Sequence, residues 1–108
     1  MRKHAEINVY GKVQGVRYRW SAREIAEQLG LVGYVKNMPD GSVFIEAEGE
    51  GESLDEFIDW CQIGPILADV EQVRVNFSQQ LKGFHEFESH HRKKQEDYYY
   101  VIESRYLV

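Results

Sequence analysis

Alternating apolar and polar residues predict short β-strands along much of the chain. In residues 4–10, Ala5, Ile7 and Val9 alternate with polar neighbours, which is typical of a strand with one buried face. Similar patterns recur further along, and the last of them is short. The expected strands cover residues 4–10, 31–36, 42–48, 69–77 and 84–88.

Two segments between these strands have the period of an amphipathic helix. Each places four apolar residues at i, i+3, i+4 and i+7, which gives one buried stripe. The stripes are Ala22, Ile25, Ala26 and Leu29 in the first segment, and Leu54, Phe57, Ile58 and Cys61 in the second. An S-x-x-E pattern at Ser21 and another at Ser53 predict capping boxes at the two helix starts.

The resulting order is β-α-β-β-α-β, the split βαβ arrangement. It predicts an α+β fold, a ferredoxin-like sandwich in which two helices cover one face of an antiparallel sheet. The domain is expected to span residues 1–88. Residues 89–108 are expected to form a C-terminal tail, whose basic and aromatic runs either stay mobile or add a strand.

Composition limits the classes of function. A chain of 108 residues with 43% hydrophobic residues supports one modest core, and a net charge of −5 argues against a nucleic-acid binder. No apolar run approaches the roughly 20 residues that span a bilayer. The basic start has no leader-like apolar stretch behind it. We therefore expect a cytoplasmic protein without membrane or nucleic-acid partners.

The lone Cys61 cannot form an intramolecular disulfide, and it is expected to be a small buried hydrophobe, with a reactive thiol as the alternative. The four histidines show no metal-ligand spacing with carboxylates or with Cys61, so no metal and no cofactor are expected. They are His4, His85, His90 and His91.

Candidate chemistry gathers in residues 11–19, between the first strand and the first helix. Gly11 and Gly15 allow a tight curl whose backbone N–H groups can converge on an anion. The helix start adds unsatisfied N–H donors, and the guanidinium of Arg19 can contact two phosphate oxygens at once. Basic residues gather around this segment, whereas residues 40–59 contain acids and no Lys or Arg. The pattern predicts a local anion site that is not a Walker loop.

The segment GKVQGVRYR, followed by LGLVGYVKNMPDGSV, EGE, FIDW and GP, resembles the acylphosphatase family from Ile7 to Phe87. The resemblance implies a ferredoxin-like hydrolase that cleaves the carboxyl-phosphate anhydride of small acyl phosphates. It also implies that neither metal nor cofactor takes part; a monomer is expected.

The same resemblance implies roles for individual residues. Arg19 and Asn37 would be catalytic, with Arg19 holding the phosphoryl group and Asn37 orienting the attacking water. The residues implied to bind the substrate phosphate are Lys12, Val13, Gln14, Gly15, Val16, Arg17 and Arg19.

Plainer interpretations compete with these roles. Arg19 could pair only with Glu24 across the helix start, and Asn37 could be a simple turn former ahead of Pro39. The whole domain could be a non-catalytic acylphosphatase-like module that binds an anion and regulates another protein. An RNA-binding domain of the same fold would need exposed aromatics on a basic strand, which the sequence lacks.

Overall fold

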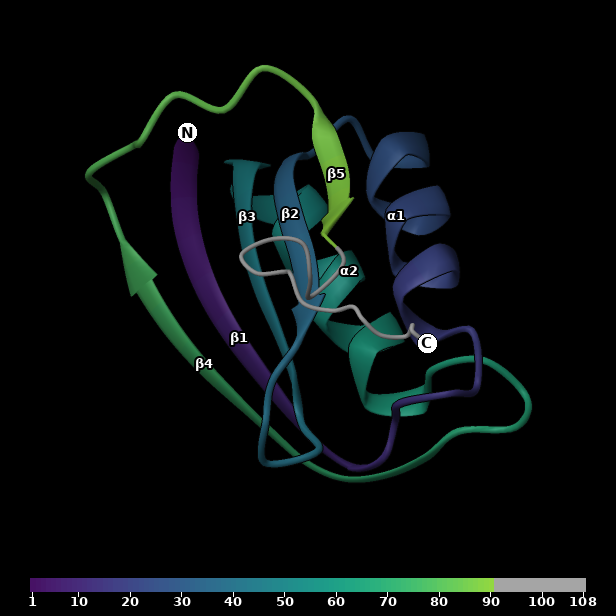
Figure 1. The fold of residues 1–108 in the computed structure, drawn as a ribbon. Helices are drawn as coiled ribbons and strands as arrows, with labels where there is room; N and C mark the ends of the chain where they lie inside the picture. Colours follow the sequence, from purple (N-terminus) through teal and green to yellow (C-terminus); the bar gives the residue numbers. More distant parts are fainter. Residues whose placement is uncertain (91–108) are drawn as a thin grey trace, which may run out of the picture.

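A computed structural model describes residues 1–90 of the chain. In these residues a five-stranded sheet has the spatial order β4-β1-β3-β2-β5, and two helices connect its strands (Figure 1). The elements are β1 (Arg2–Lys12), α1 (Tyr18–Gln28), β2 (Val32–Asn37), β3 (Val43–Glu50), α2 (Gly51–Ile63), β4 (Asp69–Ser78) and β5 (Phe87–His90). The predicted α+β sandwich and its element order are confirmed.

The central pair of strands is β1 and β3, which are antiparallel with Ala5 opposite Ala47 and Ile7 opposite Ile45. β4 and β2 join the outer sides of this pair in antiparallel orientation, and β5 joins β2 in parallel. Successive strand residues point to opposite faces, so the apolar residues of β1 and β3 gather on the face that α1 and α2 cover. This face holds the hydrophobic core.

The helices bury the predicted stripes. Ala22 and Ala26 of α1 are buried, as are Leu54, Phe57 and Cys61 of α2. The prediction that Cys61 is a buried hydrophobe is confirmed, and burial raises the pKa of its thiol to about 12.

Tyr18 links the start of α1 to α2. Its buried ring lies 5.2 Å from the ring of Trp60, centroid to centroid, and its hydroxyl donates to the carbonyl oxygen of Cys61 at 2.8 Å. Burial raises the pKa of Tyr18, so the hydroxyl stays protonated and able to donate. The first turn of α1 is thereby anchored in the core.

The predicted capping boxes are wrong. α1 begins at Tyr18 and α2 at Gly51, so Ser21 and Ser53 lie inside the helices, and neither N-cap makes a side-chain hydrogen bond. The Ser21 amide donates to the carbonyl of Arg17 at 3.0 Å, as an interior helical amide does. The conformations of the preceding loop and strand, which the capping pattern does not encode, set both helix starts.

β5 begins and ends later than the pattern predicted, and it reaches His90, two residues beyond the expected domain end. Of the predicted tail, residues 89–108, the first two belong to β5, and residues 91–108 lie outside the described residues. Neither helix within residues 1–90 has the length and apolar character needed to cross a bilayer.

Gly33 offers a test of the packing between β2 and β3. A Cβ atom there would lie 1.9 Å from the carbonyl oxygen of Glu46, and the backbone φ is +143°. We expect Gly33→Ala to lower the free energy of unfolding by about 3 kcal/mol or more, because a backbone strand must move. Urea denaturation followed by circular dichroism measures the loss.

Gly30 is the matched control, because its φ is +73° but a Cβ there would meet nothing within 4 Å. Gly30→Ala should cost only the left-handed backbone penalty of about 1–2 kcal/mol. Equal losses of unfolding free energy in the two variants would show that the close approach of Gly33 to the Glu46 backbone is not a constraint.

Candidate active site

The loop between β1 and α1 curls because two of its residues adopt left-handed backbone conformations. Gly15 has a φ of +74°, and Arg17 has a φ of +67° although it is not a glycine. Left-handed residues in such a loop turn neighbouring N–H groups toward one concave side, which is a common anion-binding geometry. A non-glycine residue in this region is strained by about 1–2 kcal/mol, and such strain concentrates at functional sites.

The start of α1 adds further donors. Arg17 is the N-cap residue, so the backbone N–H groups of Tyr18, Arg19 and Trp20 precede the first intrahelical bonds. The first turn contains no acidic residue, and no side chain caps it. These free donors and the positive end of the helix dipole favour an anion at this point.

A cleft of about 320 Å³ opens beside the loop and the helix start. Its lining residues are Val13, Gly15, Arg17, Tyr18, Arg19, Trp20, Arg23, Asn37 and Ser89. Three of these nine described residues are arginines and none carries a carboxylate. In a chain of net charge −5, the cleft is therefore locally cationic.

The backbone of β5 orients Arg19. Its Nη1 donates to the carbonyl oxygen of His90 at 2.7 Å. Burial lowers the pKa of Arg19, yet a guanidinium stays charged near neutral pH. The alternative in which Arg19 only pairs with Glu24 has no support among residues 1–90, where no such ion pair occurs.

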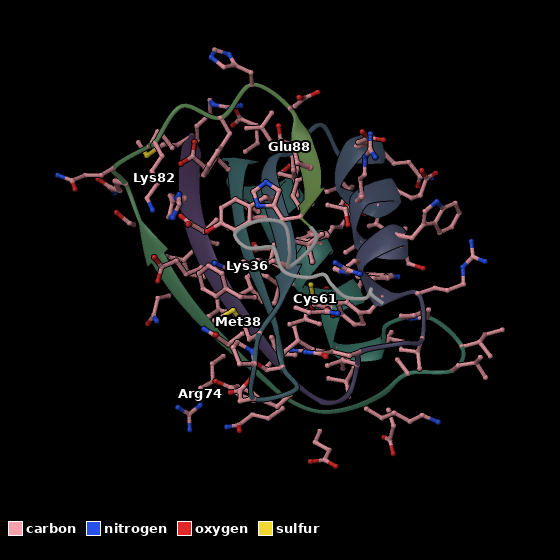
Figure 2. All side chains as sticks on the ribbon, in the orientation of Figure 1. Lys36, Met38, Cys61, Arg74, Lys82 and Glu88 are labelled. Atoms are coloured by element: carbon pink, nitrogen blue, oxygen red, sulfur yellow. The ribbon has the colours of Figure 1, made fainter. Side chains whose placement is uncertain are left out.

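Asn37 is the last residue of β2, where it pairs with Val43, and it lines the same cleft as Arg19. The turn that follows β2 is tied to the β1–α1 loop by Gln14. The side-chain Nε2 of Gln14 donates to the carbonyl oxygens of Met38 and Ser42, each at 2.8 Å. Figure 2 shows Met38 at this end of the sheet. These bonds bring the strand end and the loop together.

The cleft contains only some of the residues implied by the family resemblance. Val13, Gly15, Arg17, Arg19 and Asn37 line it. The other three do not line it: Lys12 ends β1 and pairs with Asp69 of β4, Gln14 bonds to the β2–β3 turn, and Val16 is in the core. Any contact of Gln14 or Val16 with a ligand in the cleft would come from the backbone.

Four polar or aromatic residues of the lining were not predicted from the sequence: Tyr18, Trp20, Arg23 and Ser89. Arg23 lies one helical turn after Arg19, so the i, i+4 spacing could have indicated it. Trp20 packs beneath the guanidinium of Arg17, whose Cζ atom lies 4.8 Å from the centroid of the Trp20 ring. Ser89 gave no local signal, because only the parallel pairing of β5 with β2 places it there.

The geometry agrees with the comparisons to known proteins. A family model described as Acylphosphatase matches residues 5–89. A curated acylphosphatase from Acaryochloris marina is 49% identical over 80 residues, which is 74% of this chain and 85% of that protein. One from Thermococcus kodakarensis is 42% identical over 85 residues, covering 77% and 93% of the two chains.

Solved structures give the same result. The crystal structure of acylphosphatase from Bacillus subtilis superimposes with a TM-score of 0.79 at 36% identity, covering 81% of this chain and 97% of the other. The fold, the cationic cleft and the matched sequence all indicate the same family. The chain belongs to the acylphosphatase family.

Proposed function

We propose that the cleft hydrolyses acyl phosphates to a carboxylate and inorganic phosphate, with Arg19 and the loop amides binding the phosphoryl group and Asn37 orienting the attacking water. Acylphosphatase activity is the function of the family to which the chain belongs. The observation that carries the residue assignment is that Arg19 and Asn37 line one cleft at the start of α1.

The phosphoryl group would be bound by fixed positive charge and fixed donors. Arg19 is held by the His90 carbonyl, so its remaining N–H groups are free to form a two-pronged contact with phosphate oxygens. The N–H groups of the curled loop and the first turn of α1 would supply the other hydrogen bonds. These groups are in place before the substrate arrives, which favours charge stabilisation in the transition state.

Asn37 would position the water that attacks phosphorus. Its amide can accept one hydrogen bond and donate another, which suits a water molecule that must point a lone pair at the phosphoryl group. The leaving group is a carboxylate, so the departing oxygen needs little protonation. Since none of the described lining residues is a carboxylate, we propose that a phosphate oxygen of the substrate accepts the proton of the water.

Metal independence is part of the proposal. The cleft presents guanidinium groups and backbone amides, which bind phosphate oxygens but do not ligate cations. Positive charge that a metal ion supplies in many phosphoryl-transfer enzymes would come here from the arginines.

We further propose that the chain acts in the cytoplasm, as a monomer, on small acyl phosphates. The negative net charge and the buried, unpaired Cys61 are consistent with this setting. The functional domain would extend from the expected residues 1–88 to His90, because Ser89 lines the cleft and the His90 carbonyl holds Arg19. Residues 91–108, which lie outside the described part, would not contribute to catalysis.

The substrate class can be tested with purified protein. Benzoyl phosphate and acetyl phosphate should be hydrolysed, whereas glycerol phosphate should not, because its alkoxide leaving group needs an acid or a metal ion that the proposed mechanism lacks. Release of inorganic phosphate measures both reactions. Comparable rates on the alkyl ester would contradict the mechanism, as would loss of turnover in EDTA that Mg²⁺ or Zn²⁺ restores.

Substitutions at the two catalytic positions should separate binding from turnover. Asn37→Ala should lower kcat about 10²–10³-fold while inorganic phosphate still inhibits with a near-normal constant, because its proposed partner is the water. Arg19→Ala should impair both turnover and phosphate inhibition. Arg19→Lys should restore little, since an ammonium cannot make the two-pronged contact.

The control for these variants is Arg74→Ala. Arg74 is exposed on β4 and does not line the cleft (Figure 2). In Arg74→Ala, kcat and the inhibition constant of inorganic phosphate should therefore both stay within about twofold of the parent values. Circular dichroism first establishes that each variant folds. A folded Asn37→Ala protein with parental kcat would leave Asn37 as a turn residue only.

A further inference from the structure

The sheet face that the helices leave open has a cluster of ionisable side chains near the start of β1. His4 and Glu6 alternate with the core residues of β1 and therefore point to this open face. The strand register places Glu48 opposite His4, and Glu46 opposite Glu6. Two neighbouring cross-strand pairs thus bring together one histidine and three glutamates from two segments that are distant in sequence.

Glu48 fixes the His4 ring. Its fully buried carboxylate accepts the backbone N–H groups of Lys82 at 2.6 Å and Gly83 at 3.1 Å, and it contacts His4 Nδ1 at 2.6 Å. A carboxylate that accepts two backbone N–H groups is also an acceptor toward the ring, so Nδ1 carries the proton that it donates, and in the neutral ring Nε2 keeps a lone pair.

That Nε2 atom is buried and makes no hydrogen bond. The side chain of His4 is 5% exposed, and its Nε2 has no hydrogen-bond partner within residues 1–90. It lies 3.1 Å from Oε1 of Glu46, a contact that is an ion pair when the ring is protonated. Two ligand atoms bound tetrahedrally to one Zn²⁺ lie about 3.3–3.5 Å apart, which follows from metal–ligand distances of about 2.0–2.2 Å. The two atoms are slightly closer than this, so a small outward shift of one side chain would let both bind the same ion.

The carboxylate of Glu46 is also oriented by its surroundings. The Tyr34 hydroxyl donates to its Oε2, and the ammonium of Lys82 lies 2.7 Å from its Oε1. These contacts fix the carboxylate with its Oε1 directed at His4 Nε2.

We propose that His4, Glu6 and Glu46 bind a divalent transition metal ion of the Zn²⁺ type. One ligand atom from each of the three lies within 4.8 Å of the others. An imidazole nitrogen with two carboxylate oxygens is a donor set that Zn²⁺ accepts. Glu48 acts on the other ring nitrogen, as a carboxylate commonly does behind a metal-bound histidine.

Lys82 is the local cation that the metal displaces. Its side chain is 54% exposed and its backbone is held by Glu48, so the ammonium can swing into solvent while the connection from β4 to β5 stays in place. Removal of this positive charge should therefore strengthen metal binding. If the cluster were only a set of structural ion pairs, the same removal would create no affinity for a metal ion.

The proposed metal site is separate from the cleft. None of His4, Glu6 and Glu46 lines the cleft, and Figure 2 labels Lys82 near the N-terminal end of β1 and Met38, which follows the cleft residue Asn37, well away from it. Binding of metal should thus act on stability and not on the hydrolysis chemistry, and the inference does not depend on the proposed function.

Isothermal titration calorimetry of the metal-stripped full chain with Zn²⁺ tests the proposal. We expect one ion per chain and a rise in Tm when Zn²⁺ is in excess. His4→Gln and Glu6→Gln should each weaken binding at least about tenfold, and Glu48→Gln about 10–100-fold. Lys82→Met should tighten it. Co²⁺ in place of Zn²⁺ should give visible absorption bands that His4→Gln removes.

Three other histidines serve as the matched control. The combined variant His85→Gln, His90→Gln and His91→Gln should bind Zn²⁺ within about threefold of the parent chain. Glu6 is only half-buried, so Glu6→Gln and Lys82→Met keep the test decisive if His4→Gln fails to fold. The proposal is overturned if the parent binds no Zn²⁺, if the triple variant abolishes binding, or if Lys82→Met weakens it.

Discussion

The antiparallel register of β1 against β3 is the constraint on which the rest of the molecule depends. With Ile7 opposite Ile45, the core residues of the two strands face the helices, whereas His4, Glu6, Glu46 and Glu48 face the open side. A slip by one residue would exchange the two faces. The same register therefore builds the hydrophobic core on one side and the cluster of His4, Glu6, Glu46 and Glu48 on the other.

The ends of these strands also determine where the cleft forms. β1 leads into the curled loop, and the turn from β2 to β3 lies next to it because Gln14 bonds to Met38 and Ser42. β5 then adds to β2 in parallel and supplies the carbonyl of His90 that holds Arg19. The cleft thus combines groups from three separate segments, each placed by backbone hydrogen bonds and not by a local motif.

Electrostatic contrast is a second consequence of this arrangement. The chain is acidic overall, yet the described lining of the cleft has three arginines and no carboxylate. The acids of β3 project from the open face, where Lys82, Tyr34 and His4 contact them. Separation of the two charge types keeps the glutamates from competing with a phosphate for the arginines.

The sequence by itself determined the fold class, the element order and the buried stripes, because two-residue and 3.6-residue periods are local properties. It also pointed to the glycine-containing loop and to Arg19. It placed both helix starts wrongly, since the left-handed Arg17 and the end of β3 set them rather than Ser21 or Ser53. Only the tertiary structure decided that Asn37 and Ser89 line the cleft with Arg19, and that Glu46 faces His4. Strand pairing between distant segments makes those contacts, and no spacing along one segment encodes them.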